Sequence, residues 1–311
     1  MIKWLELVRY QNLILLALMQ LLFRFGFLKL QNIPLALSDL QYLLLVGATL
    51  CLAAAGYVLN DIHDQDTDRH NRPQRLTVGH GISEKAAYNA YFALTILGVG
   101  FGFLLSNIIC KPMFSAIFIC IAGVLHLYAT SLKQSLLVGN VIVAVLLAFS
   151  VYIIGIFDLY PILNADNRAL LSIVFQVLID YAVFALLINF IREIVKDLED
   201  VDGDYNQGMN TLPIALGVAR TSRVVFYLSI VPIAVLFFYI NKFFMSSGLY
   251  FAAIYAFALV VAPLIYFSIK LWNARHKAEY HHLSNVLKFV LLFGILSILV
   301  VSLNIRYNAQ G

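Results

Sequence analysis

Residues 37–59 read LSDLQYLLLVGATLCLAAAGYVL, and residues 60–68, which follow directly, read NDIHDQDTD. The first stretch is long and apolar enough for one helix to cross about 30 Å of hydrocarbon, which takes about 20 residues. It is continuously apolar and does not alternate, so it predicts a membrane-spanning helix and not a barrel strand. The acidic burst must then lie where this span ends.

The same pattern recurs along the chain. Of its 311 residues, 62% are hydrophobic and 12% are charged, whereas a soluble domain carries about 25% charged residues. We therefore predict an all-α fold, a single domain over residues 1–311 in which nine transmembrane helices surround a central cavity. The predicted spans are Leu13–Leu28, Leu37–Leu59, Ala86–Ile109, Met113–Ala129, Leu136–Phe157, Ala169–Ile191, Val224–Ile240, Leu249–Leu271 and Val286–Leu303.

The basic residues predict the orientation of the spans. Fifteen of the 21 lie on the side of the N-terminus and six on the other, which makes the first side cytoplasmic. We expect a multi-pass protein of the cell inner (plasma) membrane, with the C-terminus outside. The basic residues are dispersed between spans, so no nucleic-acid partner is expected.

The acidic burst after the second span has helical spacing. Asn60, Asp64 and Asp68 would line one face of a continuing helix, with Asp61 beside them. Like charges at this spacing repel each other, so a cation is needed to offset them. Carboxylates without thiols select hard ions, and Mg²⁺ usually binds through one or two carboxylates, water and a substrate phosphate.

A second burst follows the sixth span. Asp197, Asp200 and Asp204 again share one helical face, so both acidic motifs are predicted at the cytoplasmic ends of helices 2 and 6. A solvated acidic loop would explain one burst more easily than two on the same side. Arg72, Arg75, Lys133, Arg192 and Lys196 lie near these motifs in the sequence and would suit a metal–diphosphate complex. We interpret five others as simple membrane anchors: Arg220, Arg223, Lys270, Arg275 and Lys277.

These motifs resemble the two signatures of the UbiA superfamily of intramembrane prenyltransferases. The first is Asn60-Asp61-x-x-Asp64-x-x-x-Asp68 followed by Asn71-Arg72-Pro73-x-Arg75. The second runs from Arg192-Glu193-Ile194-Val195-Lys196-Asp197 through Glu199-Asp200 and Gly203-Asp204 to Thr211-Leu212-Pro213. The resemblance extends to Arg9, Asn12, Tyr128, Lys133, Gly139 and Asn140, and so covers nearly the whole chain.

The resemblance implies a role for each matching residue. The metal ligands, expected to hold two Mg²⁺, are Asn60, Asp61, Asp64, Asp68, Asp197, Asp200 and Asp204, of which Asp61 and Asp197 play a supporting part. The implied contacts to the donor diphosphate are Arg9, Asn12, Arg72, Arg75, Lys133 and Lys196. The implied catalytic residues are Asp64, Asp68, Asp200 and Asp204, with Tyr128 and Asn140 near the reacting carbon.

The resemblance also implies a reaction. A prenyl diphosphate would ionise to an allylic carbocation, which a lipid or aromatic acceptor then attacks within the membrane. The second motif is most similar to that of the branch that makes archaeal-type ether lipids by adding a geranylgeranyl group to geranylgeranylglyceryl phosphate. Tyr10 and Leu76-Thr77-Val78-Gly79-His80 depart from the usual family wording, the first where acceptor contacts are implied and the second in the loop over the diphosphate.

Two other functions are compatible with the sequence. An aromatic-acceptor enzyme of quinone biosynthesis, of the 4-hydroxybenzoate or naphthoate type, would share the donor site. A cation transporter would use acidic residues as an ion path, but such sites lie near the bilayer midplane. Here the acidic bursts lie at span ends, and no charge is expected to be buried in the middle of a span.

Overall fold

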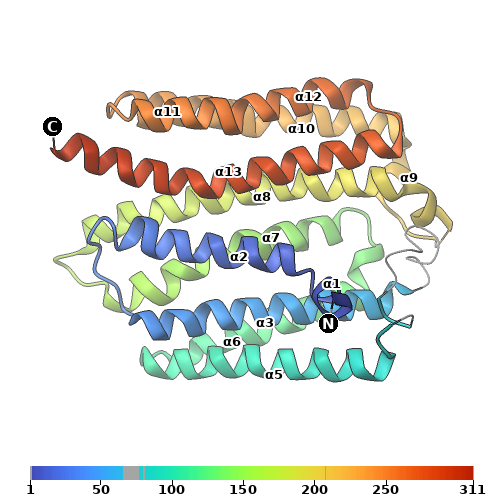
Figure 1. Cartoon of the computed structure of the whole chain (residues 1–311), viewed down its shortest axis with the longest axis horizontal. Coiled ribbons are helices and arrows are strands. Elements are labelled where there is room, and N and C mark those ends of the chain that lie inside the picture. The colour runs from blue at the N-terminus through green and yellow to red at the C-terminus, as the bar shows by residue number, and fades with distance from the viewer. Residues whose placement is uncertain (1, 66–76, 80, 207, 311) are drawn as a thin grey trace. The chain divides into compact units, whose positions relative to one another are not determined.

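The computed structural model describes residues 2–65, 77–79, 81–206 and 208–310. No β-strand forms within these ranges, where Val78 and Ile82 make one isolated bridge. The α-helices are α1 (Ile2–Leu7), α2 (Tyr10–Leu21), α3 (Asp39–His63), α5 (Glu84–Ile108), α6 (Ser115–Thr130), α7 (Val138–Ile154), α8 (Arg168–Asn206), α9 (Leu212–Leu216), α10 (Val218–Tyr239), α11 (Tyr250–Ala256), α12 (Ala262–Asn273) and α13 (Lys277–Gln310) (Figure 1). Four π-helical segments extend or join them: η1 (Leu22–Leu28), η5 (Gly155–Leu159), η7 (Ile240–Met245) and η8 (Phe257–Val261).

The prediction of an all-helical chain with nine spans is confirmed. In the described part of the chain, nine helical stretches are long and apolar enough to cross a membrane: Tyr10–Leu28, Asp39–His63, Glu84–Ile108, Pro112–Thr130, Val138–Ile162, Arg168–Asn206, Val218–Met245, Tyr250–Asn273 and Lys277–Asn308. Large apolar side chains such as Ile96, Met113 and Ile254 are more than two-thirds exposed, as expected where the surrounding solvent is lipid.

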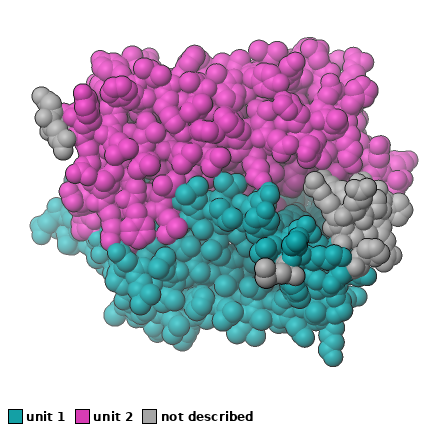
Figure 2. Space-filling view, viewed as in Figure 1, with its two compact units in different colours: residues 1–20, 35–142, 149–178 teal, residues 21–34, 143–148, 179–311 magenta. Residues whose placement is uncertain are grey.

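The chain forms two compact units (Figure 2). Unit 1, in teal, contains Met1–Gln20, Leu35–Ile142 and Phe149–Leu178. Unit 2, in magenta, contains Leu21–Pro34, Val143–Ala148 and Ile179–Gly311. The first acidic motif therefore belongs to unit 1 and the second to unit 2. The single domain and the central cavity stay predictions.

In unit 1, α3 packs against both α5 and α6. A capping box starts α3: the Ser38 hydroxyl accepts from the Gln41 backbone N–H at 3.3 Å, and Gln41 Oε1 accepts from the Ser38 N–H at 2.8 Å. Gly102 allows α5 to approach α6, because a Cβ at this position would lie 2.2 Å from the buried ring of Phe118. This contact joins the two helices that both pack against α3, which carries the start of the first acidic motif.

We expect Gly102→Ala to destabilise the protein, because the added methyl group overlaps the Phe118 ring. Overpacking of this kind costs about 1–3 kcal/mol. Gly100→Ala on the same helix is the control, since a Cβ there meets no atom within 4 Å, and alanine favours a helix by up to about 1 kcal/mol. Thermal unfolding in detergent should show a lower midpoint for Gly102→Ala alone. Equal midpoints would contradict the predicted overlap.

In unit 2, α13 packs against α11, α12 and η1, while α12 also packs against α10. Buried hydroxyl pairs join these helices: Ser229 to Ser268 at 2.7 Å between their oxygens, and Ser222 to the Tyr280 hydroxyl at 2.9 Å. Such pairs satisfy polar groups between helices in a medium without water.

Two charged residues are buried close to the ends of spans, while Asp180, in the middle of the sixth predicted span, is half-buried. Arg24, in η1, is 1% exposed, and Asp158, in η5, is fully buried. Asp158 Oδ1 accepts a hydrogen bond from the Leu37 backbone N–H at 3.0 Å, so its carboxylate helps to hold the chain that leads into α3. Asp180 on α8 is half-buried and hydrogen-bonded to the Tyr239 hydroxyl within unit 2. The mean hydropathy of a span could not predict the groups that bind these carboxylates.

Candidate functional site

The first acidic motif lies at the C-terminal end of α3. The helix ends at His63 with Asp64 as its C-cap, so Asn60 and Asp64 are one turn apart, as the spacing predicted. The Asn60 side-chain amide donates to Asp64 Oδ2 at 2.6 Å, and Lys133 Nζ contacts the same oxygen. Both Asn60 and Asp64 are buried, each with 8% of its surface exposed. The structure thus joins three of the predicted site residues.

Gly139 places the turn that carries Lys133. A Cβ on Gly139 would lie 3.2 Å from the Lys133 Cα, which is closer than most side chains tolerate. Any other residue at this position would push the start of α7 and the turn before it apart by a few tenths of an ångström. This gives a physical reason for the Gly139 that accompanies Lys133 in the sequence pattern.

Asp61 is fixed by two partners. Arg9 Nη2 lies 3.1 Å from Asp61 Oδ1, and the Thr77 hydroxyl donates to Asp61 Oδ2 at 3.0 Å. Burial opposes the charged form of Arg9, but Asp61, Tyr57 and Asp64 together outweigh it and raise the pKa of the guanidinium. Arg9 adopts left-handed backbone geometry with φ of 50°, a strained conformation for a non-glycine residue. The pair with Asp61 helps to stabilise it.

Arg9 and Asn12 form one group around Tyr57. The guanidinium of Arg9 lies over the Tyr57 ring at 5.0 Å from its centroid, and Asn12 Nδ2 donates to the Tyr57 hydroxyl at 3.4 Å. Both were predicted to contact the diphosphate. In the structure they support the end of α3 from α2 and the residue before it, and their contact with a substrate stays a prediction.

The second acidic motif lies within the last turns of α8, which continues through Gly203 to Asn206. Lys277 Nζ lies 3.6 Å from Asp200 Oδ1, and His281 Nδ1 lies 3.0 Å from Glu199 Oε1. Lys277 was interpreted as a membrane anchor, and the structure corrects this by placing it against the acidic motif. Asp204 is buried, at 7% exposure.

The chain turns sharply after this motif. The backbone carbonyl of Asp204 accepts a hydrogen bond from the Met209 N–H at 3.0 Å, and Gly208 has φ of +67°. Glycine adopts this left-handed conformation without the penalty that a Cβ brings. Asp197, the residue after Lys196, is half-buried and makes at least one polar or electrostatic contact with neighbouring groups.

Lys196 was predicted to bind the diphosphate, but its partner in the structure is Glu193. Lys196 Nζ lies 3.1 and 2.9 Å from the two carboxylate oxygens of Glu193. Arg192 Nη1 lies 3.6 Å from Glu193 Oε1. These three residues lie on the membrane side of the acidic motif along α8. A role of Lys196 at the diphosphate stays a prediction.

The remaining site predictions have no structural test. Tyr128, on α6, and Asn140, on α7, are half-buried, and each makes at least one hydrogen bond, ring contact or electrostatic contact with neighbouring groups. Asp68, Arg72 and Arg75 lie outside the described residues. The roles of all five stay predictions.

The donor atoms of the first motif fit Mg²⁺. Asn60 Oδ1 is buried and has no hydrogen-bond partner in the described structure, so an oxygen donor lies free beside the Asp64 carboxylate. Within the described ranges, no three His, Cys, Asp or Glu side chains form a ready-made metal site. Mg²⁺ commonly takes only one or two carboxylates and completes its shell with water and phosphate oxygens, so this arrangement suits it.

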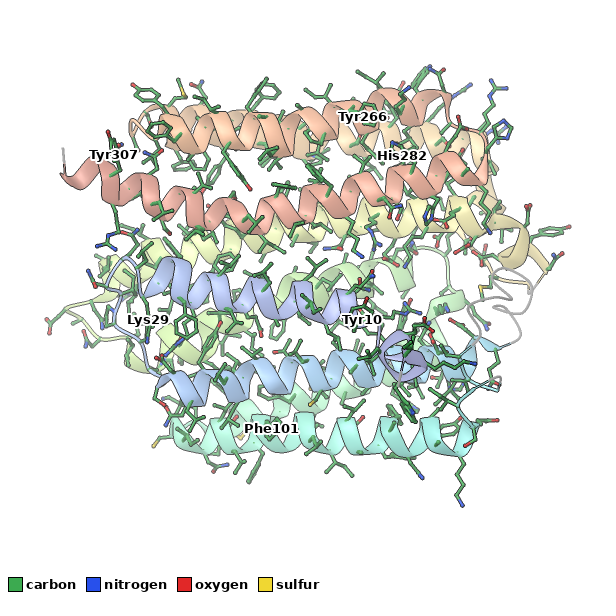
Figure 3. The ribbon with its side chains drawn as sticks, viewed as in Figure 1. Tyr10, Lys29, Phe101, Tyr266, His282 and Tyr307 are labelled. Carbon is green, nitrogen blue, oxygen red and sulfur yellow. The ribbon has the colours of Figure 1, made fainter. Side chains whose placement is uncertain are left out.

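A separate groove of about 490 Å³ opens on unit 2. It is walled by residues of η8, α12 and α13, and the side chains of Tyr266 and His282 lie close together at its edge (Figure 3). The Tyr266 hydroxyl and His282 Nε2 are 3.1 Å apart. None of its lining residues is acidic, so this groove does not fit a metal–diphosphate complex.

Several residues around the motifs were not singled out as site residues from the sequence. Thr77 and His281 contact Asp61 and Glu199, and Tyr57 contacts Arg9 and Asn12. Only Thr77 carried a signal, because it stands in the segment that departs from the family wording. Tyr57 and His281 carried none, since their partners are set by helix packing.

Comparison with known proteins gives consistent results. The sequence model of the UbiA prenyltransferase family matches residues 26–292 of this chain. The chain is 35% identical over 184 residues to the digeranylgeranylglyceryl phosphate synthase of Methanoregula boonei, which covers 59% of this chain and 60% of that protein. It is 32% identical over 266 residues to the enzyme of the same name from Hyperthermus butylicus, covering 85% of this chain and 82% of the relative.

Solved structures share the fold. One, described as "Structural and mechanistic insights into the biosynthesis of Digeranylgeranylglyceryl phosphate synthase in membranes", has a TM-score of 0.64 at 25% identity and covers 96% of this chain and 97% of its own. A UbiA homologue from Archaeoglobus fulgidus bound to GPP and Mg²⁺ has a TM-score of 0.60 at 14% identity and covers 95% and 99%. The second likeness concerns the fold alone.

Proposed function

This chain belongs to the UbiA prenyltransferase family and is a multi-pass membrane enzyme, and we propose that it transfers a geranylgeranyl group from geranylgeranyl diphosphate to geranylgeranylglyceryl phosphate. The arrangement of Asn60, Asp64 and Lys133 carries this proposal, since it pairs hard oxygen donors with a cation at a buried helix end. The names of the similar synthases support the choice of acceptor.

Each acidic motif would contribute to binding two Mg²⁺. The proposed ligands are Asn60, Asp64 and Asp68 in the first motif and Asp200 and Asp204 in the second, with Asp61 and Asp197 supporting them. The metal supplies positive charge that stabilises the leaving diphosphate. A homologue of the same fold from Archaeoglobus fulgidus is described as bound to Mg²⁺ and GPP, which supports Mg²⁺ as the metal.

The chain's own residues act on the charge and geometry of the donor. Lys133, with Arg72 and Arg75, would bind phosphate oxygens, while Arg9 and Thr77 keep Asp61 in one orientation. The donor's C1–O bond breaks and its electron pair leaves with the diphosphate. The acceptor's hydroxyl oxygen then forms the new C–O bond and loses its proton. The apolar walls of the predicted central cavity would exclude water that could otherwise capture the allylic cation.

The proposed location is the plasma membrane, with the N-terminus and both acidic motifs cytoplasmic and the C-terminus outside. The excess of basic residues on the side of the acidic motifs supports this orientation. Membrane lipids would surround the exposed apolar side chains, and the lipid substrates would reach the enzyme from the bilayer.

The test uses purified protein, radiolabelled geranylgeranyl diphosphate, Mg²⁺ and three acceptors: geranylgeranylglyceryl phosphate, 4-hydroxybenzoate and 1,4-dihydroxy-2-naphthoate. We expect prenylation of the glyceryl phosphate only, complete loss of product with EDTA, and recovery on addition of excess Mg²⁺. Prenylation of only an aromatic acceptor would overturn the proposed acceptor and keep the donor site. No product with any acceptor or donor length, together with cation flux in liposomes, would overturn the enzyme itself.

A further inference from the structure

Helices α8 and α13 are packed side by side in opposite directions within unit 2 (Figure 1). Four contacts define their register: as the residue number rises along α13, the number of its partner on α8 falls, as in any antiparallel pair. These contacts are Asp200 with Lys277, Glu199 with His281, Phe184 with Gly294, and Tyr181 with Ser297. This register places Lys288 opposite Arg192, between the acidic end of the pair and its apolar part.

Arg192 and Lys288 lie close enough to repel each other electrostatically. In the described structure Lys288 has no hydrogen-bond or ion-pair partner, and the buried Nε of Arg192 has no hydrogen-bond partner. Both residues are half-buried, so a ligand can reach them. Their neighbours Ile191 and Leu287 are buried apolar residues.

The charges at this level of the helix pair do not balance. Arg192, Lys196 and Lys288 bring three cations, whereas Glu193 brings one carboxylate, which Lys196 contacts through both oxygens and which lies 3.6 Å from Arg192 Nη1. Two like charges facing each other away from bulk water are unfavourable unless an anion lies between them. A phosphate monoester carries about −1.5 to −2 charges near neutral pH, which matches the excess.

We propose that Arg192 and Lys288 form a second anion site, which binds the phosphate monoester of the acceptor lipid. This inference rests on the proposed function, because it supplies the acceptor that the reaction needs. Arg192 precedes Asp200 by eight residues, which is about 12 Å along a helix. The site is thus separate from the acidic motif and lies deeper along the span, where it would keep the phosphate away from the metal ligands and leave the acceptor's hydroxyl free to react.

The first test measures binding of geranylgeranylglyceryl phosphate to the full chain by native mass spectrometry, without donor or turnover. We expect Lys288→Met and Arg192→Gln each to weaken binding at least ten-fold, and Lys288→Arg to retain it. Lys270→Met is the matched control, because Lys270 is an exposed lysine of the same unit whose ammonium lies over Tyr266, and it should bind as the wild type does. Equal binding by all variants would overturn the site.

The second test separates a phosphate site from a merely structural role. The wild type should bind geranylgeranylglycerol, which lacks the phosphate, at least ten-fold more weakly than the phosphate ester, and Lys288→Met should bind both equally. Affinity for geranylgeranyl diphosphate should not change in Lys288→Met. Equal wild-type affinity for the two lipids would overturn the proposal even if a variant failed to fold. Because binding is measured without turnover, a failure here is distinct from a failure of the proposed reaction.

Discussion

The Asp64→Asn enzyme is expected to lose prenyl transfer by about 10³-fold, which corresponds to about 4 kcal/mol of transition-state stabilisation. Asp64 is the buried carboxylate that both the Asn60 amide and the Lys133 ammonium contact. The substitution keeps the size of the side chain and removes its charge. It also removes the negative charge that faces Lys133, so metal binding and cation placement are lost together. Initial rates with labelled geranylgeranyl diphosphate measure the effect.

The control for this prediction is Asp166→Asn. Asp166 is an exposed carboxylate in the loop before α8, and its loss should leave the rate unchanged. The Mg²⁺ concentration that gives half-maximal rate should rise for Asp64→Asn and stay the same for Asp166→Asn. An Asp64→Asn enzyme that keeps more than a tenth of the wild-type rate would show that Asp64 is not a metal ligand.

Local patterns in the sequence predicted those features of the structure that depend on a single helix. Continuous apolar runs predicted nine spans, and helical spacing predicted that Asn60 and Asp64 would meet. The same spacing predicted an acidic face on the sixth span, and α8 does continue through it to Asn206. These features depend only on the period of a helix and the thickness of a membrane, and both determine the spacing of apolar and polar residues along the sequence.

Contacts between distant segments left no such trace. Arg9 pairs with Asp61 across 52 positions, and Lys277 with Asp200, because helices pack in three dimensions in a way that no local period encodes. The buried Asp158 was missed for a related reason. Its carboxylate is satisfied by the backbone N–H of Leu37, so the cost that makes buried charges rare is offset by a partner far away in the chain.

The π-helical segments were also unpredicted. Residues 22–28 and 257–261 read as ordinary apolar helix, yet both are π-helical. Pro263 follows the second segment in the same helical stretch and lacks the N–H that would bond to the carbonyl of Leu259. No proline lies in or directly after residues 22–28. Sequence therefore placed the candidate site residues on their helices, while the identity of their partners needed the structure.

The Lys133→Met enzyme is expected to transfer prenyl groups about 10²- to 10³-fold more slowly, the range for loss of one charge-stabilising group. Lys133 is half-buried and positioned by the turn against Gly139, with its ammonium on Asp64. During the reaction that cation would be needed on the leaving diphosphate. Methionine keeps the length of the side chain, so the change tests charge more than packing. Donor affinity and single-turnover rate are the measurements.

Lys133→Met should differ from Asp64→Asn in the sign of one effect. Without the ammonium, Asp64 loses the cation that contacts its carboxylate, and Asn60 Oδ1 stays available beside it, so Mg²⁺ affinity should stay the same or rise while donor affinity falls. In Asp64→Asn both affinities should fall. Lys85→Met, which changes an exposed lysine in the first turn of α5, should alter neither. If Lys133→Met lowered Mg²⁺ affinity as much as Asp64→Asn does, Lys133 would act by organising the metal ligands and not by binding the diphosphate.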